Sequence, residues 1–227
     1  MISMDNKLPM NTQLAFKYEE KFWEEDAIMI GVDEVGKGAL SGPVYAGVVC
    51  FNPLVLRDRI SYIESIGIND SKKISSLKRE SICRELMTGI CYWGVGSADV
   101  TCIDSFGISF ATKLAIHHAI RMALSTMPRK RIHLVVDGYG FSTRYNGIEY
   151  NLEGIIKGDG SVLSIAAASI IAKVARDRYM CELGKQYPVY GYEKHKGYGT
   201  LMHRTAIQKW GVTPHHRKLF VRNIGAL

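Results

Sequence analysis

Short apolar runs that end at acidic or turn residues divide the chain into predicted strands. AIMIGVD (27–33) is such a run and ends at the acidic pair Asp33 and Glu34, and PVYAGVVCF (43–51) is the next. A glycine-rich turn separates the two runs, so we expect a hairpin. Three further strands are predicted, at CYWGVGSA (91–98), at RIHLVVDG (131–138) and within IEYNLEGIIKGDG (148–160).

Helical spacing of apolar residues fills most of the remaining chain. A long helix is expected from a cap at Asp104 through about Met127, with Phe110, Leu114 and Met122 on its buried side. The segment 164–183 is rich in Ala and Ser, so that helix can pack close to a neighbouring surface. Other predicted elements are a short helix within 12–25, a helix over 76–89, a loop over 187–200 and a helix over 200–210. This order predicts an α/β fold in which helices flank both faces of a mixed five-stranded sheet.

Composition makes this a folded protein and excludes several classes. The chain has 227 residues, of which 47% are hydrophobic and 22% charged, as expected for one large globular domain. No apolar run approaches the roughly 20 residues of a membrane span. The acid-rich N-terminus lacks the apolar core of a signal peptide, which favours the cytoplasm. Five cysteines without a C-x-x-C pair favour idle thiols over disulfides or zinc.

Charge is concentrated near the end of the chain. The net charge is +7, and residues 194–227 contain seven Lys and Arg side chains but no Asp or Glu. Tyr198, Trp210 and Phe220 are interleaved with these cations. Such a segment favours contact with nucleic acid, which offers phosphates to the cations and bases or sugars to the rings. The alternative is a solvated basic tail.

The stretch GVDEVGKGALSG (31–42) resembles a phosphate-binding loop, but its chemistry argues against one. Gly36 and Lys37 fit the pattern G-x-x-x-x-G-K-[ST], whereas Gly38 replaces the required hydroxyl residue. Asp33 and Glu34 inside the loop would repel a bound phosphate. The carboxylates therefore need another explanation.

Acidic residues follow several predicted strands and suggest a metal site. Asp33, Glu34 and Asp137 end strands, and Asp159 follows in KGDG. Carboxylates that converge there would repel one another unless cations intervene, and Mg²⁺ prefers such oxygen ligands. Two ions about 4 Å apart can hydrolyse a phosphodiester.

The metal hypothesis has two open points. Adjacent strand residues point to opposite faces, so Asp33 and Glu34 share a site only if the strand ends or bulges there. Each acid is alternatively a turn or helix cap. Asp177 competes with Asp159 for the fourth position, but a surface ion pair with Lys173 at helical spacing explains it adequately.

Other nucleophiles and ligands form no pattern. The pairs His117–His118 and His215–His216 favour exposed or hydrogen-bonded histidines over metal ligands. Ser41 and Ser169 have no triad-like context in the sequence, although a triad is defined by geometry.

A set of motifs between about Ile30 and Phe220 resembles type 2 ribonuclease H (ribonuclease HII). In order, they are GVDEVGKGALSGPVYAGVV, NDSKKIS, VVDG, KGDG, SIAAASIIAKVARDR, HKGYGT and TPHHRKLF. The resemblance implies a ribonuclease H-like fold with a C-terminal helical extension. It divides the chain into an N-terminal extension (1–26), a catalytic domain (27–184) and a basic helical extension (185–227). We also expect a monomer.

The resemblance implies an activity and residue roles. The family cuts RNA paired with DNA, and cuts 5′ of single ribonucleotides embedded in DNA, leaving 5′-phosphate and 3′-hydroxyl ends with Mg or Mn. By motif, the metal-binding acids are Asp33, Glu34, Asp137 and Asp159. The loop Gly36-Lys37-Gly38 matches the tripeptide that reads the ribose 2′-hydroxyl, and Tyr198 matches the tyrosine on the following deoxyribose. Lys72 and Lys173 resemble phosphate-facing lysines.

Two departures leave alternatives open. The family loop usually reads Gly-Arg-Gly, and Gly-Lys-Gly is also a feature of the type 3 branch, which cuts hybrids only. The usual G-Y-P-T is G-Y-G-T here, and Gly199 lacks the stiffness of proline. The short stretch before the first strand favours type 2, because type 3 enzymes carry an extra N-terminal domain. A resolvase on the same fold and a non-catalytic nucleic-acid-binding module are the remaining rivals.

Overall fold

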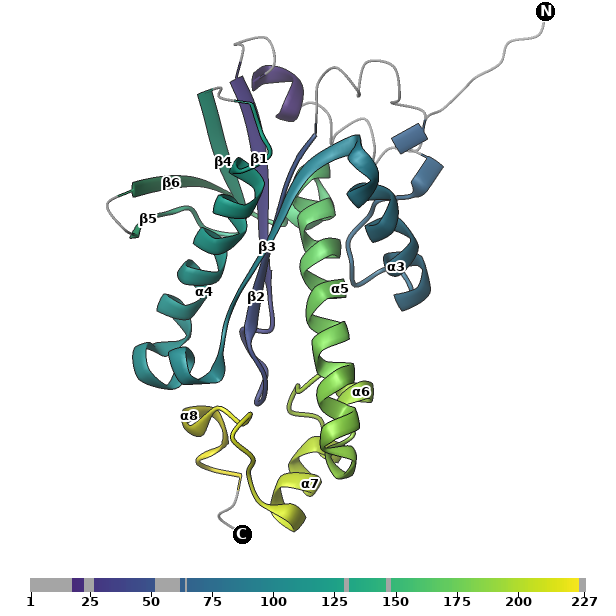
Figure 1. Ribbon diagram of the computed structural model, residues 1–227, viewed down its shortest axis with the longest axis vertical. Coiled ribbons are helices and arrows are strands. Elements are labelled where there is room, and N and C mark those ends of the chain that lie inside the picture. The colour runs from purple at the N-terminus through teal and green to yellow at the C-terminus, as the bar shows by residue number, and fades with distance from the viewer. Residues whose placement is uncertain are drawn as a thin grey trace, which may run out of the picture.

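A single mixed sheet organises the molecule (Figure 1). This computed structural model describes residues 18–22, 27–51, 62–63, 65–128, 131–145 and 148–224. The strand order is β3-β2-β1-β4-β6-β5, in which β1 pairs antiparallel with β2 and parallel with β4. The strands are β1 (Ala27–Val35), β2 (Val44–Phe51), β3 (Cys91–Ala98), β4 (Arg131–Asp137), β5 (Phe141–Tyr145) and β6 (Ile148–Ile155).

The expected hairpin of β1 and β2 is confirmed, but the expected number of strands is wrong. Six strands are present among the described residues, and β5 is the one missed. It pairs antiparallel with β6 at the edge of the sheet. Its sequence, FSTRY, is largely polar and carries too few apolar positions for the pattern to mark it.

Helices cover both faces of the sheet. In Figure 1, α4 lies on one side, and α5 lies on the other with α3 beside it. The helical segments are α3 (Ser76–Glu85), η1 (Leu86–Ile90), α4 (Val100–Leu124), η2 (Gly158–Gly160), α5 (Leu163–Gln186), η3 (Pro188–Tyr190), α6 (Tyr192–His195), α7 (Leu201–Trp210) and α8 (Lys218–Val221). No described helix is long and apolar enough to cross a membrane.

Helix α4 begins earlier than expected and buries a different face. Its cap is Asp99, which accepts a hydrogen bond from the Cys102 N–H. Phe110 and Met122 are 45% and 43% exposed, so the expected buried side is wrong, although Leu114 is partly buried. The buried face consists of small residues instead, among them Ala111, Ala115, Ala119 and Ala123.

Glycines on β3 explain this choice. A Cβ atom on Gly94 would lie 2.1 Å from the Ala119 carbonyl oxygen, and one on Gly96 would lie 2.1 Å from that of Ala115. The helix backbone therefore rests directly on the strand, and bulky side chains have no room between them.

Helix α5 packs on the opposite face with equal closeness, as its Ala and Ser content predicted. A Cβ on Gly47 of β2 would lie 2.3 Å from the Ala168 carbonyl oxygen. The helix continues beyond the sheet to the C-terminal segment (Figure 1). It thus links two regions that are far apart in the sequence.

The C-terminal segment forms a small core of its own around the end of α5. Buried members include Met180, Leu183, Tyr190, Tyr192, Ile207 and Val221. Main-chain bonds join it to the turn between β1 and β2: the Leu40 N–H donates to the Gly197 carbonyl at 2.8 Å, and Ser41 bridges to His216.

Of the helix expected within 12–25, the structure describes residues 18–22, which are helical. The rest of that segment lies outside the described residues. Glu19 is buried, and its carboxylate accepts a hydrogen bond from the Ser164 N–H at the start of α5.

Candidate active site

Three of the predicted acids meet at the carboxyl ends of the central strands β1 and β4. Asp33 lies on β1 and Asp137 ends β4, and these strands are parallel neighbours with Val32 beside Val136. Asp159 lies in η2, just after β6, and the N–H of its neighbour Gly158 donates to Asp137 Oδ1 at 2.7 Å. Parallel strands therefore deliver the carboxylates to the same place, as the sequence predicted.

Glu34 follows Asp33 at the end of β1, whose last residue is Val35, and the strand has no bulge there. Both residues pair regularly with β2, Asp33 with Gly47 and Glu34 with Ala46. The Glu34 N–H donates to Asp33 Oδ1 at 2.8 Å. The carboxylate of Glu34 forms an ion pair with Lys37 Nζ at 2.6 Å.

The surroundings of Asp33 favour its neutral form. Burial is the main cause that raises its pKa, from 3.8 to about 7, and repulsion by Glu34 and Asp137 adds to it. Hydrogen bonds from the Ser169 hydroxyl and the Glu34 N–H act in the opposite direction. So high a pKa indicates that the negative charges around Asp33 are not balanced by nearby cations.

Lysine ammonium groups supply part of that charge. Lys72 Nζ donates to Asp159 Oδ2 at 3.0 Å, and its pKa is raised by that bond, with a contribution from Asp33. Lys72 thus contacts Asp159 and lies within electrostatic reach of Asp33. Asp177, the competing acid, instead contacts Lys173 and Arg79. These contacts favour Asp159 as the companion of Asp33 and Asp137.

The residues present fit a hard divalent cation by chemistry, although they do not form a closed cage. Within the described part of the chain, no three His, Cys, Asp or Glu side chains are arranged as metal ligands. The donors are carboxylate oxygens, the type that Mg²⁺ and Mn²⁺ prefer. Cationic groups already contact Glu34 and Asp159, which shows that these carboxylates accept positive charge.

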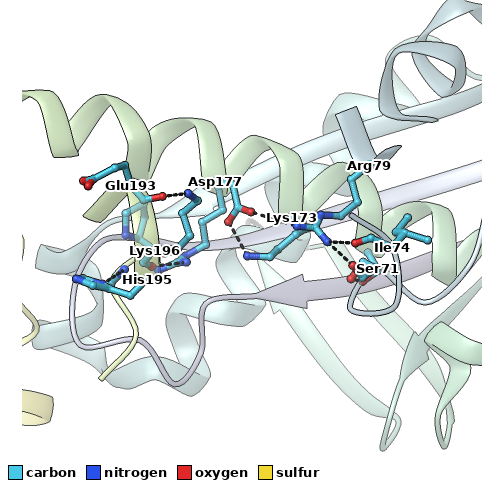
Figure 2. A network of polar contacts seen from close by, with 12 residues as sticks. Ser71, Ile74, Arg79, Lys173, Asp177, Glu193, His195 and Lys196 are labelled. Atoms are coloured by element: carbon cyan, nitrogen blue, oxygen red, sulfur yellow. Dashed lines mark hydrogen bonds and ion pairs between the residues drawn. The ribbon is translucent and has the colours of Figure 1, made fainter. Parts of the chain in front are cut away.

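A network of polar contacts positions the loop that carries Lys72. Figure 2 shows Asp177 between Lys173 and Arg79, and Arg79 Nη1 donating to the carbonyls of Ser71 and Ile74, each at 2.6 Å. The Ser71 hydroxyl lies 2.9 Å from that of Ser169, which contacts Asp33.

The predicted pair of Lys173 and Asp177 is confirmed at 2.6 Å, but both side chains are largely buried. A surface ion pair was expected there. Burial lowers the pKa of Lys173, whose Nζ lies 6.0 Å from the centroid of the Tyr198 ring.

The glycine-rich turn and the loop of Tyr198 lie against the same side chain. Gly36 has φ of +91°, and a Cβ on it would lie 2.2 Å from Arg176 Nε. The Arg176 guanidinium carbon lies 5.2 Å from the Tyr198 ring centroid. Gly38, by contrast, has open space where a Cβ would be, and the Lys37 side chain is half exposed.

The loop of Tyr198 is held firmly despite Gly199. The Tyr198 carbonyl accepts from the Thr200 N–H at 2.8 Å and lies 3.0 Å from His203 Nδ1. The Gly199 carbonyl accepts from Arg204 Nε at 3.0 Å. Hydrogen bonds therefore supply the order that a proline ring would otherwise give.

Sequence reasoning missed Ser169, Arg176 and Arg217 as parts of this region. Arg217 had been counted with the cations of the basic segment, yet it is fully buried. Its position beside His216 and Lys218 in a charged stretch gave no sign of burial. Ser169 carried a signal, because it lies on the small-residue face of α5.

His118 and His216 are hydrogen-bonded as predicted, whereas His117 is buried against the ring of Tyr150. His203 and His216 are buried with their Nε2 atoms 3.2 Å apart, and His203 Nε2 lies 3.3 Å from the Ser41 hydroxyl. Ser41 is itself fully buried, so this contact has no access to a substrate.

Comparisons with known proteins identify the family. The family model described as Ribonuclease HII matches residues 30–223. A Ribonuclease HII of Caldicellulosiruptor bescii is 41% identical over 213 residues, which covers 93% of this chain and 96% of that protein.

Solved structures agree in fold. The ribonuclease H2 of Pyrococcus horikoshii has a TM-score of 0.64 at 25% identity, covering 87% of this chain and 97% of its own. A structure described as Bst-RNase HIII in complex with Mn²⁺ also has a TM-score of 0.64, at 19% identity, with 88% and 63% covered. The fold is thus of the ribonuclease H type, as the motifs implied, and the family depends on divalent metal. The chain belongs to the ribonuclease HII family and is a ribonuclease H enzyme.

Proposed function

We propose that this enzyme cuts the RNA strand of RNA–DNA hybrids and also cuts 5′ of single ribonucleotides embedded in duplex DNA. The products would carry 5′-phosphate and 3′-hydroxyl ends. The observation that carries the proposal is the meeting of Asp33, Asp137 and Asp159 next to the Gly36–Gly38 turn. We also propose that the enzyme acts as a monomer in the cytoplasm.

The acids would form the reaction centre. Asp33, Glu34, Asp137 and Asp159 would hold two divalent cations, Mg²⁺ or Mn²⁺, which supply Lewis acidity toward water and the leaving 3′ oxygen. Lys37 and Lys72 now contact Glu34 and Asp159, so these ammonium groups would leave the carboxylates and turn to substrate phosphates. Lys173, near Tyr198, would be a further phosphate contact.

Selection of the cut would come from the Gly36–Gly38 turn and Tyr198. The open space at Gly38 allows main-chain groups to approach a ribose, whose 2′-hydroxyl distinguishes RNA from DNA. The Tyr198 ring would lie on the following deoxyribose, where an additional hydroxyl would be crowded. Together they would recognise a step from RNA to DNA.

The test uses two substrates, with Mg²⁺ or Mn²⁺ supplied in turn. One is a DNA duplex with a single ribonucleotide and the other is a full RNA–DNA hybrid. We expect cleavage of both, with the first cut 5′ of the ribonucleotide. Cleavage of the hybrid alone would overturn the proposal in favour of a type 3-like specificity, which Lys37 and Gly199 would then mark.

A variant tests the role of the acids in the same assay. Asp137→Asn keeps an oxygen that can accept the Gly158 N–H, so we expect a folded protein that still binds substrate. Its cleavage should be nearly abolished, because a ligand charge is lost. Glu182→Gln, at an exposed ion pair with Lys185, is the matched control and should cut normally. Equal rates for Asp137→Asn and wild type would remove Asp137 from the reaction centre.

A further inference from the structure

Two arginines are buried where the C-terminal segment meets the β1–β2 turn, and neither forms an ion pair with an acid among the described residues. Arg176 on α5 and Arg217 before α8 are both 0% exposed. All the hydrogen bonds described for their guanidinium groups go to main-chain carbonyl oxygens. Burial lowers the pKa of both side chains, that of Arg217 to about 9. Burying such charges is costly, so a purely apolar contact would hold these segments at lower cost.

The hydrogen bonds of Arg176 connect two segments that are proposed to select the substrate. Its guanidinium donates to Pro43 O at 3.0 Å, Ser41 O at 3.2 Å and Lys196 O at 2.9 Å. The first two carbonyls follow the Gly36–Gly38 turn, and the third lies two residues before Tyr198. A planar fork with donors in fixed directions sets the relative position of the groups it binds.

Arg176 also contacts both selectivity elements directly. Arg176 Nε lies so close to Gly36 that a Cβ there would have no room, and the Arg176 guanidinium carbon lies over the Tyr198 ring. One side chain therefore separates the turn from the ring. Lys196, whose carbonyl Arg176 binds, is labelled in Figure 2 next to His195.

Arg217 holds the turn from the other direction. It donates to Gly42 O through Nε at 2.9 Å and through Nη2 at 2.8 Å, and to Lys37 O through Nη1 at 2.8 Å. Its own N–H donates to Leu40 O. Both ends of the β1–β2 turn are thus fixed by one guanidinium.

We propose that Arg176 is a positioning residue for substrate selection: it sets the spacing between the Gly36–Gly38 turn and the Tyr198 ring, and Arg217 fixes the turn against it. This inference rests on the proposed function, because it assigns the selectivity to those two elements. It adds that selectivity depends on a buried residue that never touches the substrate.

The test measures a ratio of two rates rather than activity alone. Single-turnover cleavage of the lone-ribonucleotide duplex is divided by that of the RNA–DNA hybrid. In the hybrid the strand that is cut is RNA, so a ribose rather than a deoxyribose follows the cut. Cleavage of the hybrid therefore does not need Tyr198 to be placed accurately. We expect Arg176→Lys to lower the ratio about tenfold or more, since small misplacements of positioning groups cost that much. A general loss of structure would lower both rates together and leave the ratio unchanged.

A double-mutant cycle then asks whether Arg176 acts through Tyr198. Tyr198→Ala alone should lower the ratio, and adding Arg176→Lys should lower it by no more than about twofold further. If the decrease in the ratio for the double variant equalled the product of the decreases for the two single variants, the role of Arg176 would be overturned. Arg178→Lys is the matched control, because Arg178 lies on the same helix but is exposed and pairs with Glu80. Its ratio should match that of wild type.

Arg217→Lys provides a second route if Arg176→Lys does not fold, as judged by circular dichroism. It disturbs the bonds to Gly42 and Lys37, and it too should lower the ratio. A folded arginine variant with the wild-type ratio would overturn the inference. A wild type that leaves the lone ribonucleotide uncut would instead overturn the proposed function together with this inference.

Discussion

Asp33 is held in surroundings that favour its neutral form. Burial and two neighbouring carboxylates raise its pKa to about 7, although an unburied Asp ionises near 3.8. The folded protein therefore binds a proton at Asp33 more readily than the unfolded chain does. Its contribution to stability is fully present below about pH 4 and is lost as the pH rises through 7. The site thus reduces the stability of the metal-free fold at neutral pH, as is common for functional sites.

Removing this charge should stabilise the metal-free protein. We expect Asp33→Asn in EDTA at pH 8 to raise the free energy of unfolding by at most about 4 kcal/mol, the equivalent of the rise in pKa. The gain should shrink toward pH 4, where the wild-type carboxyl is protonated as well. Thermal unfolding of both proteins at pH 8 and pH 4.5 checks this. A variant less stable than wild type at pH 8 would contradict it.

Glycines in the strands let the helices pack closely on the sheet, and this affects which buried helix faces can be predicted from the sequence. On β1, β2 and β3, glycines at Gly31, Gly47, Gly94 and Gly96 allow helix backbones to approach directly. Bulky side chains are excluded from these contacts. An amphipathic pattern that counts large apolar residues therefore chooses the wrong face of α4, whereas the Ala and Ser content of α5 identifies its packing correctly.

Other features depend on contacts that no local pattern records. The strands β1, β2, β3 and β4 and the acids at their ends follow from apolar runs and from strand direction, so the sequence predicts them. The polar strand β5 is defined only by its partner β6. The buried positions of Arg176 and Arg217 depend on hydrogen bonds to carbonyls more than a hundred residues away in the sequence. The Lys196 carbonyl, which Arg176 also binds, is the exception. Burial of such residues cannot be predicted from their neighbours in the sequence.

Gly47 should tolerate no side chain. A Cβ there would lie 2.3 Å from the Ala168 carbonyl oxygen, so helix and strand would have to separate. We expect Gly47→Ala to lower the free energy of unfolding by about 1–3 kcal/mol or more, as overpacking does. Urea denaturation followed by circular dichroism measures this.

Gly38→Ala is the control for that measurement, because nothing lies within 4 Å of its Cβ position and it lacks a positive φ. Its stability should stay within about 1 kcal/mol of wild type. Similar losses in both variants would show that packing on α5 is not the cause.

The whole molecule combines two regions with opposite responses to pH. Burial lowers the pKa of His203 and of His216 to about 4, from 6.5, and it lowers the pKa of His195 as well. His203 contacts the Tyr192 ring edge to face, His216 is tilted against that ring, and His195 stacks on His203, all beside the C-terminal core. Their contribution to stability is present above pH 6.5 and is lost as the pH falls toward 4, the reverse of Asp33.

Mild acid should therefore open the C-terminal segment before the sheet. Uptake of two protons gives a loss of up to about 2.7 kcal/mol per pH unit between pH 6.5 and 4. We expect hydrogen exchange at pH 5, corrected for the intrinsic rate, to show less protection in residues 190–221 than at pH 7.5. Protection of β1 and β4 should change little. Equal losses in both regions would contradict this prediction.

The contact between Arg217 and the Lys37 carbonyl joins residues 180 positions apart. On the ribosome the early part is made first, and translation of the stretch from Asp159 to Arg217 takes about 3 to 12 seconds at usual rates. All four acids are therefore synthesised before Arg217, whose guanidinium binds both ends of the β1–β2 turn. A nascent chain in that interval would carry the proposed metal-binding acids without the contacts proposed to order the turn for substrate selection, and a prematurely terminated chain would stay in that state.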